Sequence, residues 1–343
     1  MVERGTRVRK LLAFLFILLV TLTPHFAEAH VKWFTKSMRE KAPIEDIITP
    51  LFMGTAVICV MLLVCLTIFV MKATNWSFFS KRERWLSGFR KHTLVLLRYG
   101  TVLALVIQVM SSVVFSPGYQ INHTIITYSI WITIALLLIP DYKATKGAGL
   151  ILLGLFTYLT AQNGLFDMLD ESYFLSIIAV FLICETKWEK FSIPLLYLGT
   201  GLSLCWVAIE KWVFPGMSID IIANYHVPTF GFPPEIFIVL VAFVEFVIGY
   251  LFIIGLLNRI LGFVVTVIFI LTTTLFGWTE IVGHTMLHIL FLIFIIEDTS
   301  FYWTPLKIYK TQRERLLFVS INFILLLVTL LLVYYIFACM MEY

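Results

Sequence analysis

The sequence predicts an all-α polytopic membrane protein of about ten transmembrane helices. Of its 343 residues, 60% are hydrophobic and only 13% are charged, whereas an average soluble domain is about 25% charged. So few charges cannot cover the surface of a soluble protein of this size. The apolar residues are gathered in long runs, each near the length that a helix needs to cross a bilayer. This composition excludes a disordered chain, a nucleic-acid-binding protein and a secreted disulfide scaffold.

The chain begins with a segment that has the features of a secretory signal peptide. Basic residues at positions 4–10 precede an apolar run at 11–23, which is too short to span a bilayer comfortably. Residues 27–29 read Ala-Glu-Ala, the small-x-small pattern of a cleavage site. Cleavage there would make His30 the mature amino terminus. The alternative is an uncleaved anchor, and in both cases residues 30–48 lead into the first span as a short interfacial segment.

Ten apolar runs after the leader are predicted to be transmembrane helices. They are continuous and do not alternate in polarity, which excludes a membrane β-barrel. The predicted spans are 49–71, 93–115, 124–140, 148–165, 172–184 (the shortest), 191–213, 235–257, 260–278, 282–296 and 316–338.

Among the loops between the later spans, the loop 214–234 is the longest one within the repeated part of the chain, and we expect it to form a lid or a half-inserted helix.

The basic residues between the spans fall in alternate loops, and the intervening loops have none. Cytoplasmic loops are enriched in lysine and arginine, so the basic loops are predicted to be cytoplasmic and to contact anionic lipid headgroups. We therefore predict an integral protein of the cell (inner) membrane whose mature amino terminus and carboxyl terminus lie on the extracytoplasmic side. The basic loops are 72–92, 141–147, 185–190, the turn after 257, and 297–315.

Two parts of the chain resemble each other at an offset of 99 residues. Leu-Leu-Arg-Tyr-Gly-Thr at 96–101 aligns with Leu-Leu-Tyr-Leu-Gly-Thr at 195–200, and both are followed by a phenylalanine and then by Pro-Gly. Each unit holds four spans, so the two units would run in the same direction. The alternative is chance similarity between leucine-rich spans. We predict two tandem parallel four-helix bundles plus one extra helix at each end, divided as 1–29, 30–92, 93–190, 191–300 and 301–343.

The second unit carries two polar motifs. The first is Glu-Lys-aromatic-x-x-Pro, which begins at Glu210, and the second is Glu-x-x-x-Gly-x-x-x-x-x-Gly-x-x-x-Arg, which runs from Glu245 to Arg259. Over about 191–298, this combination resembles the DoxX family of small four-helix membrane proteins. The resemblance implies a four-helix bundle with Lys211, Glu245 and Arg259 at the polar positions of the family.

The first unit departs from this pattern. Ser111 and Ser112 stand where Glu210 and Lys211 stand in the second unit. The first unit therefore resembles a degenerate copy, and two equivalent active sites are not expected.

The resemblance implies a function without fixing one. Some members of the DoxX family are membrane subunits of quinone-linked oxidoreductases, and others have assembly or trafficking roles. Our leading hypothesis is a redox membrane subunit, quinone-linked or metal-dependent, that acts at the outer face of the second bundle. Quinone is implied by the resemblance only. The expected partners are the lipid bilayer and partner redox subunits or outer-face proteins. The alternatives are a transporter or metal-handling protein and a non-catalytic assembly or anchoring subunit. The sequence has no phosphate-binding glycine loop, haem-attachment motif or nucleophile elbow.

Charged residues within the predicted spans are the first candidates for a catalytic site, because a charge in hydrocarbon is costly and usually faces the bundle interior. Glu245 lies about ten residues into its span, near the middle of the membrane. It is a candidate proton-transfer group or the partner of a cation. Glu210 and Lys211 complete the set, with Lys211 paired to Glu245 across the bundle. The alternatives are a Glu245 carboxyl kept protonated by burial and a Lys211 that extends to the interface.

A second candidate site is a metal centre. Glu280, His284 and His288 are four residues apart, which places them on one helical face. Two histidines at this spacing can share a metal ion that a nearby carboxylate completes. His226, from an outer loop, and His30, if cleavage exposes its amine, would add ligands suited to copper or another transition metal. The alternative is a pair of buried histidines bonded to neighbouring helices.

Overall fold

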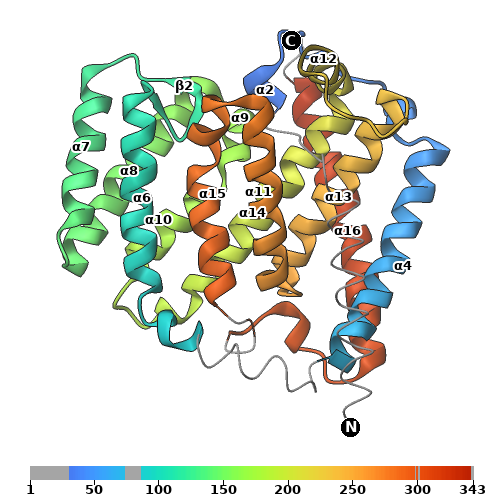
Figure 1. The fold of residues 1–343 in the computed structure, drawn as a ribbon. Coiled ribbons are helices and arrows are strands. Elements are labelled where there is room, and N and C mark those ends of the chain that lie inside the picture. Colours follow the sequence, from blue (N-terminus) through green and yellow to red (C-terminus); the bar gives the residue numbers. More distant parts are fainter. Residues whose placement is uncertain (1–30, 74–85, 298, 300–301, 341–343) are drawn as a thin grey trace.

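The computed structural model describes residues 31–73, 86–297, 299 and 302–340 (Figure 1). The predicted cleavage site and His30 lie outside the described residues. Within them, the protein is an all-α assembly of long helices that run nearly parallel to one another, with short elements capping both ends. The predicted fold class is confirmed.

All ten predicted runs fold as helices. Eight of them are long and apolar enough to cross a membrane, whereas α7 and α10 have 15 and 11 residues and are shorter than a bilayer requires. The described residues therefore contain eight helices that could span a membrane by length and composition, and the predicted count of about ten is not confirmed. The helices are α4 (Pro50–Ala73), α6 (Thr93–Met110), α7 (Thr124–Leu138), α8 (Tyr142–Asn163), α10 (Tyr173–Ile183), α11 (Ser192–Val213), α13 (Pro234–Ile254), α14 (Asn258–Phe276), α15 (Trp278–Ile296) and α16 (Gln312–Met340).

The ends of these helices follow from local sequence signals. The Asp141 carboxylate caps α8 by accepting hydrogen bonds from two backbone N–H groups of its first turn. Pro234 begins α13, where its fixed φ suits a first helical turn. Gly255 ends that helix at φ +75°, a conformation that other residues adopt only with strain. Gly277 does the same at φ +66° after α14.

One element differs from the prediction. The span expected over 93–115 ends as a helix at Met110, and a short antiparallel hairpin of β1 (Val113–Val114) and β2 (Ser116–Gln120) follows. The side-chain amide of Gln108 explains this change of direction, because it both donates to the carbonyl of Phe115 and accepts from its N–H group, at 3.2 and 3.0 Å. Phe115 itself takes a positive φ of 63°.

The eight central helices form two groups of four. Helices α6, α7, α8 and α10 contact one another in sequence, as do α11, α13, α14 and α15. The groups meet where α10 packs against α11 and where α15 packs against α6. A parallel repeat with a two-fold axis along the membrane normal predicts this pair of contacts, since the repeat makes α10 equivalent to α15 and α11 to α6. The repeat itself stays a prediction.

The two extra helices do not lie at opposite ends of the assembly. Instead, α4 and α16 pack against each other and against the second group, where α4 contacts α13 and α16 contacts α11 (Figure 1). Helices α4 and α16 therefore cover one side of the second group.

Close packing in the second group depends on two glycines. A Cβ atom on Gly201 would lie 2.5 Å from the carbonyl oxygen of Gly249, and one on Gly249 would lie 2.6 Å from that of Gly201. Helices α11 and α13 thus touch through their backbones, which fixes their relative register.

Short elements gather at the end of the molecule that the sequence analysis assigns to the outside (top in Figure 1). The loop expected to form a lid or a half-inserted helix contains an eleven-residue helix, α12, and its relation to the membrane stays a prediction. The described parts of the predicted basic loops lie at the opposite end. Which end faces the cytoplasm stays a prediction. The outer elements are α2 (Val31–Phe34), α3 (Ile44–Ile47), the hairpin, α9 (Leu165–Met168), η1 (Leu169–Glu171) and α12 (Pro215–Tyr225), and those of the opposite end are η2 (Glu189–Phe191) and η4 (Pro305–Lys307).

Candidate functional site

The first candidate site is a buried ion pair between α11 and α13. The ammonium of Lys211 donates to Glu245 Oε2 at 2.6 Å. The side chain of Lys211 is 0% exposed and that of Glu245 is 19% exposed. The predicted pairing across the bundle is therefore present, and Lys211 is buried in the bundle.

Helix geometry explains how these two side chains meet. Because α11 and α13 are antiparallel and touch at Gly201 and Gly249, Lys211 starts about two turns closer to the outer end than Glu245. Side chains lean toward the amino end of their own helix. Lys211 therefore leans inward and Glu245 leans outward, which closes the axial gap.

Glu210 does not join this pair. Its side chain points to another face of α11, as expected for the neighbouring position on a helix, and its Oε1 lies 3.1 Å from the ammonium of Lys32. The three predicted catalytic residues are thus divided between two places in the structure.

Glu210 belongs to a second group of buried charges, which we name the carboxylate cluster. It comprises Lys32, Arg39, Asp167, Asp170, Glu171 and Glu210. The Lys32 ammonium lies 2.6 Å from Asp170 Oδ2 and 3.1 Å from Asp167 Oδ1, and Arg39 reaches the same Asp167 oxygen at 2.7 Å. Three carboxylates from three elements of the chain therefore surround one ammonium.

Burial and charge act against each other in this cluster. Burial alone would lower the pKa of Lys32, but the surrounding carboxylates raise it overall, so the ammonium stays charged. Burial raises the pKa of Asp170, although Lys32 opposes the shift. Burial and the neighbouring Asp170 charge raise the pKa of Glu171 to about 8.

Sequence reasoning missed the carboxylate cluster. Asp167, Asp170 and Glu171 fall within five positions of one outer loop, and this local density of acidic residues was the available signal. These acidic residues meet Lys32 and Glu210 only in the folded chain, because the contacting residues are more than 30 positions apart in the sequence. No local pattern reveals such contacts.

The third site lies on the outer half of α15. Glu280 Oε1 is 3.0 Å from His284 Nδ1, and both residues are buried. The same carboxylate oxygen accepts a hydrogen bond from the Thr272 hydroxyl on α14. The imidazole of His284 packs against the rings of Trp33 and Phe269, with centroids 5.1 and 4.3 Å away. His284 is therefore buried between aromatic rings and beside a carboxylate of its own helix, and neither the metal site nor the alternative of two histidines bonded to neighbouring helices is settled by this arrangement.

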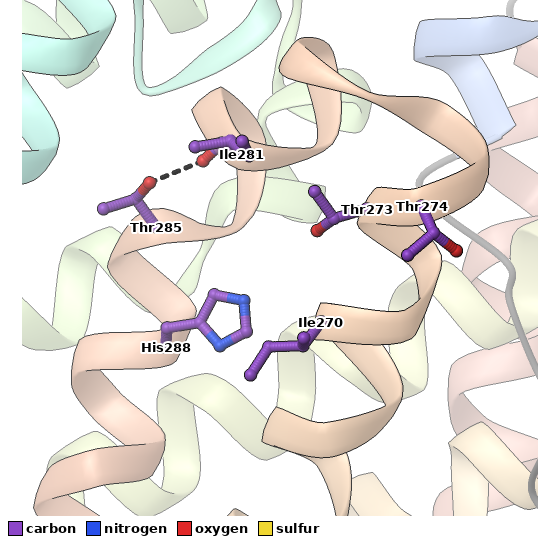
Figure 2. Close-up of a pocket in the computed structure, with 6 residues that line it drawn as sticks. All are labelled: Ile270, Thr273, Thr274, Ile281, Thr285 and His288. Atoms are coloured by element: carbon purple, nitrogen blue, oxygen red, sulfur yellow. Dashed lines mark hydrogen bonds between the residues drawn. The ribbon is translucent and has the colours of Figure 1, made fainter.

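His288, one turn further along α15, faces a groove. The groove has a volume of about 340 Å³ and lies between α14 and α15 (Figure 2). The imidazole points across it toward Ile270. No residue in the described part of the chain hydrogen-bonds to this half-buried imidazole. The other residues that line the groove are Thr273, Thr274, Ile281 and Thr285.

His226 is the one remaining predicted metal ligand within the described residues, and it forms no metal-binding group with the others. His226 caps α12 in the left-handed conformation and is exposed. Among the described residues, no group of three or more histidine, cysteine or acidic side chains has an arrangement that could hold a metal ion. His30 lies outside the described residues, so a copper or other transition-metal site stays a prediction.

Arg259 lies at the other end of the second group. Its guanidinium donates to the carbonyl oxygens of Ile296 and Glu297 at 3.3 and 3.2 Å, which caps the carboxyl end of α15. It is therefore separate from the Lys211–Glu245 pair.

Comparison with known proteins identifies one family. Residues 198–278 match the DoxX family model, so the second part of the chain is DoxX-like and contains the motif residues Lys211, Glu245 and Arg259. No curated protein matches the sequence. No solved structure matches it either. The family match ends before Glu280 and His288, and it does not extend to the first group of four helices.

Proposed function

We propose that this DoxX-like membrane protein is a redox subunit that binds a lipid-soluble quinone at the groove between α14 and α15. The observation that carries the proposal is His288, whose imidazole faces this groove with no hydrogen-bond partner among the described residues. A half-buried imidazole that makes no hydrogen bond within the protein can bond to a ligand in the groove, and such a bond would add to the affinity of the ligand.

The groove has the size and position for a quinone headgroup. Its volume of about 340 Å³ falls within the range of about 300–1,000 Å³ typical of small-molecule pockets. Ile270 and Thr274, at its edge, are exposed on the outer surface of a helix long enough to span the membrane. A ligand dissolved in the bilayer would enter sideways and leave its apolar tail among the lipids.

The polar lining favours the reduced form of such a ligand. The hydroxyls of Thr273, Thr274 and Thr285 donate to backbone carbonyls of their own helices at 2.5–3.0 Å, so they present oxygen lone pairs to the groove. A neutral imidazole adds a nitrogen acceptor. Acceptors complement the two hydroxyl groups of a hydroquinone better than the two carbonyl oxygens of a quinone.

Oxidation of a hydroquinone releases two protons and two electrons. His288 would accept the two hydroxyl protons one after the other, and the two electrons would pass to an electron acceptor in a partner redox subunit. His284 and Glu280 follow on the same helical face at intervals of one turn. Since Glu280 and His284 already contact each other at 3.0 Å, they would carry the proton toward the outer end of α15.

Binding of a short-chain quinol to the purified full-length protein tests the proposal. We expect His288→Gln to weaken binding roughly 5- to 30-fold, the effect of losing about 1–2 kcal/mol of hydrogen bonding. His123→Gln, which changes an exposed histidine before α7, is the matched control and should bind like the wild type. Equal affinity for wild type and His288→Gln would refute the proposed site.

Two further outcomes separate the alternative functions. Flux of a solute through liposomes that contain the protein, without quinol binding, would favour the transporter. Loss of a partner complex in a variant that still binds quinol would indicate an assembly role.

A further inference from the structure

The carboxylate cluster has no part in the proposed quinone site. It lies where α2, α9, η1, α11 and α16 meet at the outer end of the molecule. Two of its side chains lie at the rim, where Arg39 is 31% and Asp167 is 18% exposed. Two others lie deeper, where Asp170 is 5% and Glu210 is 0% exposed.

The cluster holds more acids than bases. Four carboxyl groups accompany two cations, so full ionisation would leave two uncompensated negative charges in a buried site. The cost of burying unpaired charge is high enough that such groups normally take up protons instead. The charges balance when two of the carboxyls are protonated.

Unpartnered atoms inside the cluster support the same conclusion. Asp170 Oδ1 and Glu210 Oε2 are buried and accept no hydrogen bond from the residues that the structure describes. The buried hydroxyl of Tyr334, from α16, also has no partner there and is close enough to Glu210 and Asp170 to interact electrostatically. A protonated carboxyl is a donor as well as an acceptor, so added protons would allow these oxygens to pair.

We propose that the carboxylate cluster is a proton-binding site in which Asp170 and Glu171, held beside Lys32 and Glu210, exchange protons with the outer compartment. Asp167, on the rim, is the point of entry, because it is the most exposed of the four carboxyls. Lys32 and Arg39 stay charged and hold the cluster together. The proposal does not depend on quinone binding.

Several groups surround these carboxyls and set the range in which they titrate. Burial and nearby negative charge raise the pKa of Asp170 to about 7 and that of Glu171 to about 8, against the attraction of Lys32. The two therefore change charge near neutral pH. The titratable and charged groups that face them are Lys32 of α2, Arg39 of the following segment, Tyr119 of β2, Asp167 of α9, Tyr173 of α10, Glu210 of α11 and Tyr334 of α16.

Infrared titration of the full-length protein in detergent tests the site. The carbonyl stretch of a protonated carboxylic acid is separate from that of a carboxylate, so the spectrum reports protonation directly. In a titration from about pH 5 to about pH 10, a range that brackets the shifted carboxyls, we expect the wild type to lose a buried carboxylic-acid signal near neutral pH.

Two variants assign the signal. Glu171→Gln and Asp170→Asn resemble the protonated side chains, so they should fold and should each remove part of the signal. Glu235→Gln, which changes an exposed carboxyl at the start of α13, is the control and should leave it intact. Should Glu171→Gln fail to fold, Glu171→Asp keeps the acid and should shift the signal.

The same spectra can overturn the proposal in two ways. A wild type that shows no titrating carboxylic-acid signal has no proton-binding cluster, whatever the variants do. A signal that persists unchanged in Glu171→Gln, Glu171→Asp and Asp170→Asn comes from elsewhere in the protein.

Discussion

The Lys211–Glu245 pair makes a quantitative prediction, because its two members are buried to different extents. Replacing Glu245 by Gln removes the carboxylate that lies 2.6 Å from an ammonium whose side chain is 0% exposed. Replacing Lys211 by Met leaves a carboxyl that is less buried, at 19% exposed. The first change should therefore cost more than the second.

The magnitude follows from the contact distance. Unit charges 2.6 Å apart attract by about 6 kcal/mol at an effective dielectric constant of about 20, and part of this offsets the cost of removing both from water. Removing one partner of a buried pair typically costs about 3–5 kcal/mol, which we expect for Glu245→Gln. For Lys211→Met we expect about 1–3 kcal/mol, the cost of taking its hydrogen-bond donor from a partly exposed carboxyl. The double variant, Lys211→Met with Glu245→Gln, should cost less than the sum of the two.

Reversible unfolding of the purified protein in mixed micelles provides the assay. The wild type, both single variants and the double variant form a cycle, and their free energies of unfolding give the coupling energy between the two side chains. We expect a coupling of at least about 1 kcal/mol, since polar contacts in membrane proteins are often weaker than those in soluble ones.

Two results would refute this reasoning. Additive effects in the double variant would mean that the two side chains do not interact in the folded protein. A larger loss for Lys211→Met than for Glu245→Gln would mean that the buried ammonium is not the costly member of the pair.

Three further predictions concern packing and pH. Gly249→Ala should lower the melting temperature by several degrees because its Cβ would lie 2.6 Å from the Gly201 carbonyl oxygen, whereas Gly154→Ala, with no neighbouring atom within 4 Å, should be neutral or stabilising. Gly283→Ala should displace the indole of Trp33, whose ring carbon would lie 1.9 Å from the new Cβ, and unchanged tryptophan fluorescence would contradict this. The raised carboxyl pKa values of η1 mean that the folded protein binds more protons than the unfolded chain. Their stabilising effect is therefore present in acid and lost as the pH rises through about 7–8, which a melting curve at each pH will show.

The sequence alone was sufficient to predict the helices, because each of them depends on its own apolar run and on local signals at its ends. All ten runs fold as helices, and the DoxX resemblance of the second part is confirmed. The errors in the predicted helix bounds arise where a side-chain contact ends a helix although the apolar run continues. The span predicted to reach residue 115 stops at Met110, where the side chain of Gln108 holds the turn that follows.

The candidate sites were predicted less completely. A single contact between two neighbouring helices, Lys211 with Glu245, could be predicted, because the motif placed both residues on adjacent helices of one bundle. Glu210 was assigned to the same site on the strength of its position next to Lys211. On a helix, however, adjacent residues point about 100° apart, and Glu210 therefore meets a part of the chain that the motif does not contain.

Helix α2 shows why position in the chain is a poor guide to the role of this segment. The sequence pattern indicates an interfacial segment, yet the structure places it between the two candidate regions of the outer end. Lys32 lies within the carboxylate cluster, and the next residue, Trp33, covers His284. Thr35 and the N–H group of Lys36 then bond to Asp220 of α12, each at 2.9 Å. One short helical turn therefore contacts the carboxylate cluster through Lys32 and His284 through Trp33, so a segment outside the long apolar runs joins the two regions.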